Sequence, residues 1–385
     1  MSPIKIAIVT PGSFTIPSSN SSSVERVVEK VAPLLQPEAE PRIYGRLGSR
    51  LPRRGQLNGV VCERFPAVNK QAYIESVGQA IKHFSPHVID VENRPQYVLT
   101  MKRLHPGKPV WLYLHSSTFI NSPYITPALL HRCLRAADKI IVNSKFLWRV
   151  VMTKAPEAAA KLAVIYPGVD TARFVSQYSS TGSAMREKLR KKRGLSGKKV
   201  VLFMGRLIPL KGVHHLLRIV PELAKRHPDL MVVIVGSPFY GSHRKTAYSR
   251  SLEALGRRCP GHVRFVPYVP YAKVPSWMLV ADVVVVPSGQ REAFGLVNVE
   301  AMSCGVPVVA TRAGGMTEIV RNDVTGYLVN QKYVKTELLD RLTKLLSNKS
   351  LRERLGRNSR ERVEQVFTWR HTASQWIRLM KDSGL

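Results

Sequence analysis

Short apolar segments rich in Val and Ile recur along the whole 385-residue chain, and longer segments of helical character separate them. These apolar segments are continuous rather than alternating, which is typical of parallel strands that helices cover on both faces. The expected strands are Ile4–Val9, Val88–Val91, Val110–Leu114, Lys139–Val142, Val200–Met204, Met231–Val235, Val263–Val266, Val283–Val286 and Val306–Ala310. They form an earlier and a later set, so the sequence predicts two doubly wound α/β domains.

The boundary between the two sets lies between Gly168 and Val200. Ser176–Ser183 is small and polar, as a linker or an exposed loop should be. Arg186–Lys199 follows with eight Lys/Arg and one Glu, and we interpret it as a solvated helix, with a nucleic-acid or membrane patch as the alternative. We place the domains at residues 1–170 and 171–365, with a C-terminal helix at 366–385 that packs back on the first domain.

The charge balance predicts an anionic partner. Lys and Arg number 59 against 26 Asp and Glu, so the net charge is +33 and the isoelectric point is about 10.4. Nucleic acid, phospholipid, an anionic polymer and phosphorylated substrates all fit this charge.

The cysteines lie far apart without a C-x-x-C pair, which favours reduced thiols in a cytosolic protein; they are Cys62, Cys133, Cys259 and Cys304. The apolar segments at Ile6–Val9 and Val274–Pro287 are too short for a signal peptide and a membrane span, so we expect any membrane contact to be peripheral.

The segment Arg291–Ala310 carries the strongest chemical signal. A short helix is expected to open at Phe294-Gly295 and to stop at Gly305, because Pro307 prevents its continuation. Its first N–H groups, near Gly295–Val297, then lie at the carboxyl edge of a parallel sheet. A helix N-terminus in that place is an anion site in the usual ligand crevice of open α/β sheets.

Two carboxylates flank this anion site, Glu292 before the helix and Glu300 on it. A carboxylate accepts two hydrogen bonds from vicinal hydroxyls, so a sugar on one side and a ribose on the other would explain both. The alternative is an exposed loop glutamate and a solvated helix glutamate. The segment Val200–Gly212 adds Arg206 and Lys211 after a buried strand, a pair able to neutralise a diphosphate.

These segments, in this order, resemble glycosyltransferase family 4, whose members are retaining enzymes with the GT-B fold of two facing Rossmann-like domains. The likeness extends over nearly the whole chain. Two further segments look most like the spore-coat protein SA group of the family, Glu92–Pro95 and Gly236–Gly241. The matching motifs are Glu292–Val308 (E-A-F-G-L-x-x-x-E-A-M-x-x-G-x-P-V), Gly205–Gly212 (G-R-x-x-x-x-K-G), Tyr166–Asp170, Ala313–Glu318 and Thr325–Tyr327.

The resemblance implies a role for each matching residue. Arg206 and Lys211 would hold the diphosphate of the donor. Glu292 would bind hydroxyls of the transferred sugar and Glu300 the ribose diol. His115, after a strand of the first domain, would lie beside the sugar. The implied donor contacts that remain are the backbone N–H groups of Phe294, Gly295, Leu296 and Val297 near the diphosphate, and Tyr268 near the base.

The chain departs from the family pattern at two places. Ser21, Ser22 and Ser23 stand where the family usually has a Gly-Gly pair, close to the phosphate or the acceptor. Pro267 stands where a glycine is common. Asp90-Val91-Glu92 superficially matches the D-x-D/E motif of metal-dependent transferases, but it ends an apolar strand and we interpret it as structural. No metal and no cofactor are expected, because Arg206, Lys211 and the helix dipole would stabilise the leaving diphosphate.

The resemblance therefore implies transfer of a sugar from a nucleotide-diphosphate donor, a UDP-sugar first, to a hydroxyl of a glycan or lipid-linked acceptor. It implies retention of configuration, no protein nucleophile, and a place in spore-coat or cell-surface polysaccharide assembly, in the cytoplasm, at the inner membrane face or at the coat. The alternative is a non-catalytic coat-associated protein that kept the fold. A nucleic-acid partner has only the charge in its favour. We expect a basic surface for an anionic acceptor on the first domain, where five arginines cluster: Arg42, Arg46, Arg50, Arg53 and Arg54.

Overall fold

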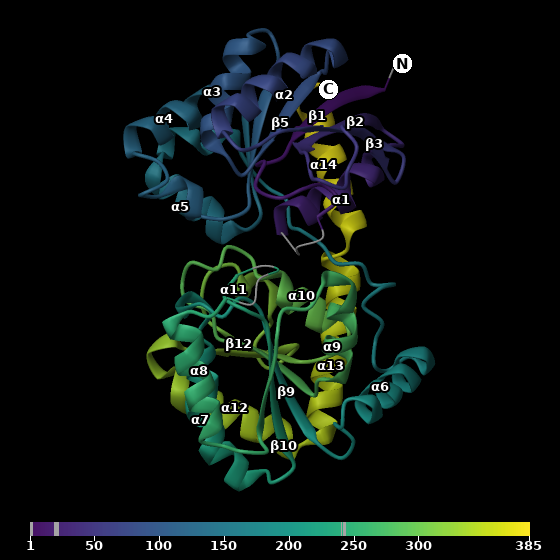
Figure 1. The fold of residues 1–385 in the computed structure, drawn as a ribbon, viewed down its shortest axis with the longest axis vertical. Helices are drawn as coiled ribbons and strands as arrows, with labels where there is room; N and C mark the ends of the chain where they lie inside the picture. The colour runs from purple at the N-terminus through teal and green to yellow at the C-terminus, as the bar shows by residue number, and fades with distance from the viewer. Residues whose placement is uncertain (1–2, 19–22, 240, 242–243) are drawn as a thin grey trace. The chain divides into compact units, whose positions relative to one another are not determined.

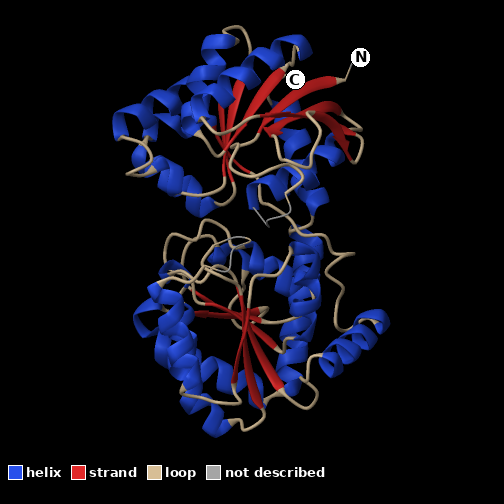
Figure 2. Cartoon of the chain, in the orientation of Figure 1, coloured by secondary structure: helices blue, strands red, loops and turns tan. Residues whose placement is uncertain are grey.

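The computed structural model describes residues 3–18, 23–239, 241 and 244–385. The chain divides into two compact units, unit 1 with Met1–Gly168 and Trp369–Leu385, and unit 2 with Val169–Thr368. Each unit consists of one largely parallel sheet with helices on both of its faces (Figure 1, Figure 2). The two Rossmann-like α/β domains that the sequence predicts are thus confirmed.

Unit 1 holds the first eight strands. The strands are β1 (Ile4–Val9), β2 (Ala39–Arg46), β3 (Arg54–Leu57), β4 (Val60–Phe65), β5 (Val88–Glu92), β6 (Val110–Leu114), β7 (Lys139–Val142) and β8 (Leu162–Val164). The helices are α1 (Ser23–Leu35), α2 (Lys70–Phe84), α3 (Pro95–Leu104), α4 (Pro127–Ala136), α5 (Lys145–Lys154) and α14 (Trp369–Asp382). The sheet order is β3-β4-β2-β1-β5-β6-β7-β8, and β3 is antiparallel to β4 while the other pairs are parallel.

The C-terminal helix α14 belongs to unit 1, where it packs against α1 (Figure 1). Trp376 of α14 stacks on Trp111 of β6, with ring centroids 5.6 Å apart. Thr372 Oγ1 also donates to the carbonyl of Tyr166 at 2.8 Å. Buried aromatic pairs of this kind add about 0.5–1.5 kcal/mol to the free energy of area burial, so the helix is firmly held.

Unit 2 holds a second sheet with six strands. The strands are β9 (Lys199–Met204), β10 (Leu230–Val235), β11 (Val263–Val266), β12 (Val283–Val286), β13 (Val308–Thr311) and β14 (Gly326–Val329). The helices are α6 (Ser180–Lys192), α7 (Val213–Arg226), α8 (Ala247–Arg257), α9 (Val274–Val280), α10 (Leu296–Ser303), α11 (Met316–Ile319), α12 (Val334–Ser347) and α13 (Lys349–Val366). All pairs are parallel in the order β11-β10-β9-β12-β13-β14.

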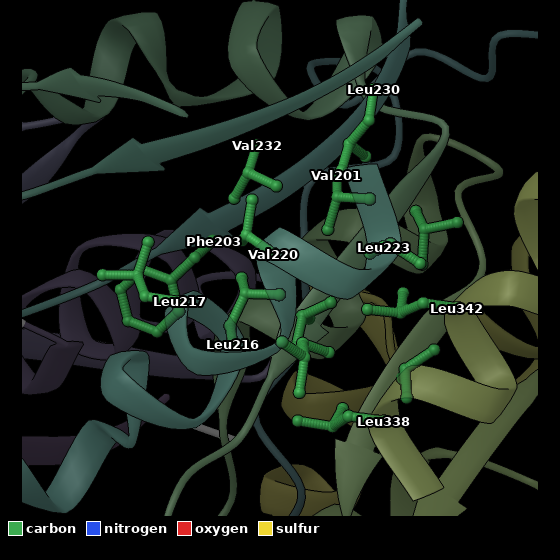
Figure 3. Packing of buried hydrophobic residues seen from close by; sticks show 14 of the residues in the cluster. Val201, Phe203, Leu216, Leu217, Val220, Leu223, Leu230, Val232, Leu338 and Leu342 are labelled. Atoms are coloured by element: carbon green, nitrogen blue, oxygen red, sulfur yellow. The ribbon is translucent and has the colours of Figure 1, made fainter. Parts of the chain in front are cut away.

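The core under one face of this sheet shows why the continuous apolar segments become strands. Val201, Phe203 and Val232 from β9 and β10 meet Leu216 and Leu223 of α7, as Figure 3 shows. Each of these side chains is at most 2% exposed. Complete burial of such a side chain stabilises the fold by about 1.5–3 kcal/mol. A strand that is apolar on both faces gains this stabilisation on each face.

All nine expected strands are present, most of them within one residue of the expected bounds. Five further strands, β2, β3, β4, β8 and β14, were not predicted. Arg42 and Arg46 interrupt the apolar pattern of β2, and Glu63 interrupts that of β4, because these strands lie toward an edge of the sheet. Arg64 of β4 is buried and donates to the carbonyls of Ile16 and Pro52. The four cysteines are all buried and unpaired. No helix in the described ranges has the length and apolar character needed to cross a membrane.

The boundary segment differs from the expectation. Ser176–Ser183 is not an exposed linker, because Gln177 donates to the carbonyls of Cys304 and Gly305 and Ser180 already belongs to α6. The basic segment forms a helix in which Lys188, Lys191 and Lys192 are exposed, as expected of a solvated helix, but two of its arginines pack on the domain. Arg186 of α6 forms an ion pair with Asp282 at 2.7 Å, and Arg190 reaches the same carboxylate at 3.2 Å. One face of the helix is therefore docked on the domain rather than free for a nucleic acid or a membrane.

Candidate active site

The crevice of unit 2 follows from its strand order. The chain proceeds from β9 outward to β11 on one side and from β12 outward to β14 on the other, so the direction reverses between β9 and β12. Ligands of doubly wound sheets bind at the carboxyl ends of the strands at such a reversal. The loops that carry Arg206, Lys211 and Glu292 leave the sheet from these two strands.

Glycines allow these two loops to approach each other closely. Lys211 ends a short 3-10 turn, Pro209–Lys211, and Gly212 follows with φ +69°. A Cβ atom on Gly212 would lie 1.9 Å from the carbonyl oxygen of Pro287. The Gly289 N–H also donates to the carbonyl of Leu210 at 2.8 Å. Lys211 is thereby held against the loop that follows β12.

Lys211 and Glu292 meet at the centre of this crevice. The Nζ atom of Lys211 donates to Oε2 of Glu292, and the two side chains are 24% and 14% exposed. Burial acts to raise the pKa of Glu292. The charge and hydrogen bond of Lys211 and the charge of Arg206 outweigh burial, so the pKa lies below its ordinary value. The carboxylate is ionised and is surrounded by cations, as a site for a polar anionic ligand requires.

Two glycines support the backbone of Glu292 from the other side. The N–H of Gly315 donates to the Glu292 carbonyl at 3.0 Å. Gly314 has φ +54°, and a Cβ atom there would lie 1.9 Å from the same carbonyl oxygen. Ser288, whose carbonyl accepts from Thr311 Oγ1, completes this support. Gly314 and Gly315 were predicted only as part of a family motif and Ser288 was not predicted, although a Gly-Gly pair after a strand is a signal of close backbone approach.

The helix α10 presents its N-terminus to the same edge of the sheet. Gly295 precedes it with φ +91°, and Leu296 and Val297 are its first two residues. The first N–H groups of a helix lack intrahelical partners and favour an anion. Phe294 contributes only its backbone here, because its ring is 2% exposed and packs edge-on against Phe367 at 5.9 Å. Gly305 ends the helix with φ +69°, as its sequence position predicts.

The remaining donor-site candidates are placed as follows. Glu300 on α10 is 4% exposed, so the interpretation of a solvated helix glutamate is wrong. Glu292 is likewise not an exposed loop glutamate. Tyr268 follows β11 and is partly exposed, two strands away from β9.

The candidates of unit 1 lie at the carboxyl edge of the other sheet. His115 follows β6, and its Nε2 atom lies 2.5 Å from Oε2 of Glu92 at the end of β5. The two side chains are 5% and 3% exposed. Ser21 and Ser22 lie outside the described residues, and Ser23 is the exposed first residue of α1. Glu92 was not predicted as a site residue, since its partner is 23 residues away in the sequence.

The structural interpretation of Asp90-Val91-Glu92 agrees with their position, because all three residues are buried in β5. Within the described part of the chain, no group of three or more His, Cys, Asp or Glu side chains is arranged to hold a metal ion.

Comparisons with known proteins show the family of the chain. The family model "Glycosyltransferase Family 4" matches residues 24–173, and the model "Glycosyl transferases group 1" matches residues 185–362. Spore coat protein SA of Bacillus subtilis (strain 168) is 30% identical over 374 residues, which cover 97% of this chain and 98% of that protein. The chain belongs to glycosyltransferase family 4. A putative glycosyltransferase of the same organism, YtcC, is 29% identical to this family 4 protein over 97% of the chain and 90% of the relative.

Solved structures show the GT-B fold. The crystal structure of Anabaena Alr3699/HepE in complex with UDP superposes with a TM-score of 0.78 at 22% identity, covering 98% of this chain and all of the other. The complex of the same protein with UDP-glucose gives a TM-score of 0.76. This chain is thus a glycosyltransferase of the GT-B type, as its sequence predicts.

Proposed function

We propose that this glycosyltransferase moves a sugar from a UDP-sugar to a hydroxyl group of an anionic glycan or lipid-linked acceptor, with retention of the anomeric configuration and without a metal ion. The observation that carries the proposal is the cluster of Lys211, Glu292 and Arg206 beside the N-terminus of α10. Cations and helix N–H groups stabilise the charge that develops on a departing diphosphate, while a carboxylate binds sugar hydroxyls.

The donor assignment has support from the comparisons. HepE has been crystallised with UDP and with UDP-glucose, and its fold matches over nearly the whole chain. The buried carboxylate of Glu300 on α10 suits a ribose diol, which would donate two hydrogen bonds to it. The diphosphate of a nucleoside diphosphate would therefore contact the basic loop and the N-terminus of α10, and its ribose would contact Glu300.

The acceptor assignment rests on the carboxyl edge of the sheet in unit 1. Arg46 donates to the Ser13 carbonyl at 2.9 Å, and Arg94 donates to the Ser13 hydroxyl at 2.8 Å. Arg94 is further held over the Phe119 ring, 3.6 Å from its centroid. Two arginines anchored on one loop after β1 favour a phosphorylated or carboxylated acceptor.

The proposal is tested by measuring UDP release from UDP-hexoses and by identifying the product. Arg206→Ala, Lys211→Ala and Glu292→Ala should each lower turnover about ten- to hundredfold, since a hydrogen bond to a charged group contributes roughly 1.5–3 kcal/mol. Lys225→Ala is the matched control, because Lys225 is exposed at the far end of α7. Near-wild-type turnover in two of the three site variants would contradict the assignment.

Further readouts separate the finer parts of the proposal. The anomeric proton coupling of the product reports retention or inversion, and a chelator should leave turnover unchanged. The alternative, a coat-associated protein without turnover, has in its favour the serines in place of the glycine pair and the name of its relative. It predicts UDP binding, seen as a rise in melting temperature, with no sugar transfer to any acceptor.

A further inference from the structure

The buried pair of His115 and Glu92 has a geometry that the proposed function does not use. The two side chains are almost completely enclosed, and Nε2 lies 2.5 Å from the carboxyl oxygen. The backbone around His115 is fixed as well. Its N–H donates to Asn93 Oδ1 at 3.1 Å, and its carbonyl accepts from Asn143 Nδ2 at 2.8 Å. Glu92 is therefore the side chain that sets the orientation of a ring whose backbone cannot move.

The surroundings of Glu92 disfavour a negative charge. Asp90 lies two residues earlier on the same strand and is 1% exposed, and Glu25 of α1 is also 1% exposed. Tyr113 of β6 packs on the imidazole with ring centroids 4.1 Å apart. A cavity of about 10 Å³ between α1 and the sheet is lined by Asp90, Glu92 and Tyr113 and otherwise mainly by apolar side chains. Several carboxylates gathered in so little space cannot all be ionised.

The titration behaviour of these groups agrees with their packing. Burial raises the pKa of Glu92 well above its ordinary value and the nearby Glu25 raises it further, whereas the neighbouring Asp90 acts to lower it. Burial also raises the pKa of Asp90, to which Glu92 adds. For His115, burial lowers the pKa from 6.5 to about 3, although Glu25 acts in the opposite direction. A neutral imidazole beside a protonated carboxyl group is the state that these directions favour.

The protonation of Glu92 decides which ring nitrogen of His115 carries the hydrogen. An ionised Glu92 accepts from Nε2–H and leaves Nδ1 as an acceptor. A protonated Glu92 donates its O–H to Nε2, so the hydrogen resides on Nδ1. Among the described residues, none forms a hydrogen bond with Nδ1 of His115. Nδ1 is also absent from the polar atoms that are fully enclosed and lack a partner, so it is not sealed off by the protein. Nδ1 is the nitrogen available to a ligand.

We propose that Glu92 is a positioning residue whose carboxylic O–H donates to Nε2 of His115, which fixes the Nδ1–H tautomer and presents Nδ1 as a hydrogen-bond donor to a sugar oxygen. The part that concerns the sugar rests on the proposed function. The part that concerns the tautomer rests only on the contacts within unit 1. Because Nδ1 carries the hydrogen, it binds an oxygen that accepts a hydrogen bond, such as a hydroxyl or a ring oxygen, and not a cation.

The tautomer is measured directly by ¹⁵N NMR of the full chain labelled at histidine, with His115→Gln to assign its signals among the 11 histidines. In the wild type at neutral pH, Nδ1 should be protonated and Nε2 unprotonated. Glu92→Gln should keep this pattern because its amide N–H donates to Nε2. Glu222→Ala, at an exposed position of α7 in unit 2, is the control and should also keep it. Glu92→Ala should lose the fixed tautomer.

Kinetics give the second readout. Glu92→Ala should lower kcat/KM about tenfold, as expected for one oriented hydrogen bond, and Glu92→Gln should restore most of it. An Nε2–H tautomer or an imidazolium ring in the wild type would overturn the proposal, as would a Glu92→Gln variant as impaired as Glu92→Ala. If no sugar transfer is found at all, the proposed function fails while the NMR result still decides the role of Glu92.

Discussion

Glu292 lies where burial and neighbouring charges act on its pKa in opposite directions. Lys211→Met removes the nearest cation and the hydrogen bond but leaves the burial. We expect the pKa of Glu292 to rise above its ordinary value of 4.5, measured by the ¹³C NMR titration of its carboxyl carbon. Lys225→Met changes the same kind of residue at an exposed place and should leave the titration unchanged.

The sign of the pH dependence follows from this shift. In the wild type the folded pKa lies below the unfolded one, so Glu292 contributes stability above pH 4.5 that is lost as the pH falls through the folded pKa. In Lys211→Met the order is reversed, and the carboxyl group destabilises the fold as the pH rises above 4.5. Urea unfolding at pH 4 and pH 7 measures the difference. A variant whose stability changes with pH like that of the wild type would contradict this account.

At the scale of elements, the turn after β13 holds the loop that carries Glu292 in place. Gly314→Ala puts a Cβ atom against the Glu292 carbonyl in a left-handed conformation, so it should destabilise the domain by more than about 1 kcal/mol and reduce donor binding. Gly107→Ala is the control. Gly107 has no atom within 4 Å of an added Cβ, and its replacement should change stability by less than about 0.5 kcal/mol. Equal stability of the two variants in denaturant unfolding would refute the role of this turn.

At the scale of the whole molecule, the charge exceeds what a donor site needs. With 59 basic and 26 acidic side chains, at least 59 − 26 = 33 Lys and Arg have no acidic partner of their own. On unit 1, Arg46, Arg50, Arg53 and Arg54 are exposed around β2 and β3, whereas Arg42 packs on Phe84 and pairs with Glu63. Four of the five clustered arginines are thus exposed to solvent, and one of them, Arg46, also donates to the Ser13 carbonyl.

We expect the protein to bind vesicles of anionic phospholipid in low salt and to release them as salt rises, because exposed charges are screened over about 8 Å at physiological ionic strength. Replacing Arg46, Arg50, Arg53 and Arg54 by Ala should weaken this binding. Vesicles of neutral phospholipid serve as the control and should bind poorly. Equal binding to both kinds of vesicle, or no binding in low salt, would show that the charge has another role.

Much of the fold is encoded locally in the sequence. Strands buried on both faces are continuous in apolar residues, so β1, β6, β7 and β12 were predicted at their observed bounds. The edge strand β11, which is partly exposed along its length, was also predicted at its observed bounds. The loops that follow β9 and β12 place Arg206, Lys211 and Glu292 at one edge of the sheet, and their order in the chain was enough to predict it. Strands such as β2 and β4 were missed because their charged residues follow from their position in the sheet and their contacts there rather than from a local pattern.

The sequence by itself determined the two α/β domains, the carboxyl edge that carries the cations and the helix N-terminus beside them, because each depends on residues close together in the chain. Only the tertiary structure decided the ion pair of Lys211 and Glu292, the docking of Arg186 on Asp282, and the contact of His115 with Glu92. These pairs join residues 81, 96 and 23 positions apart. Burial and partner charge set their protonation and orientation, and both arise only when distant segments pack together.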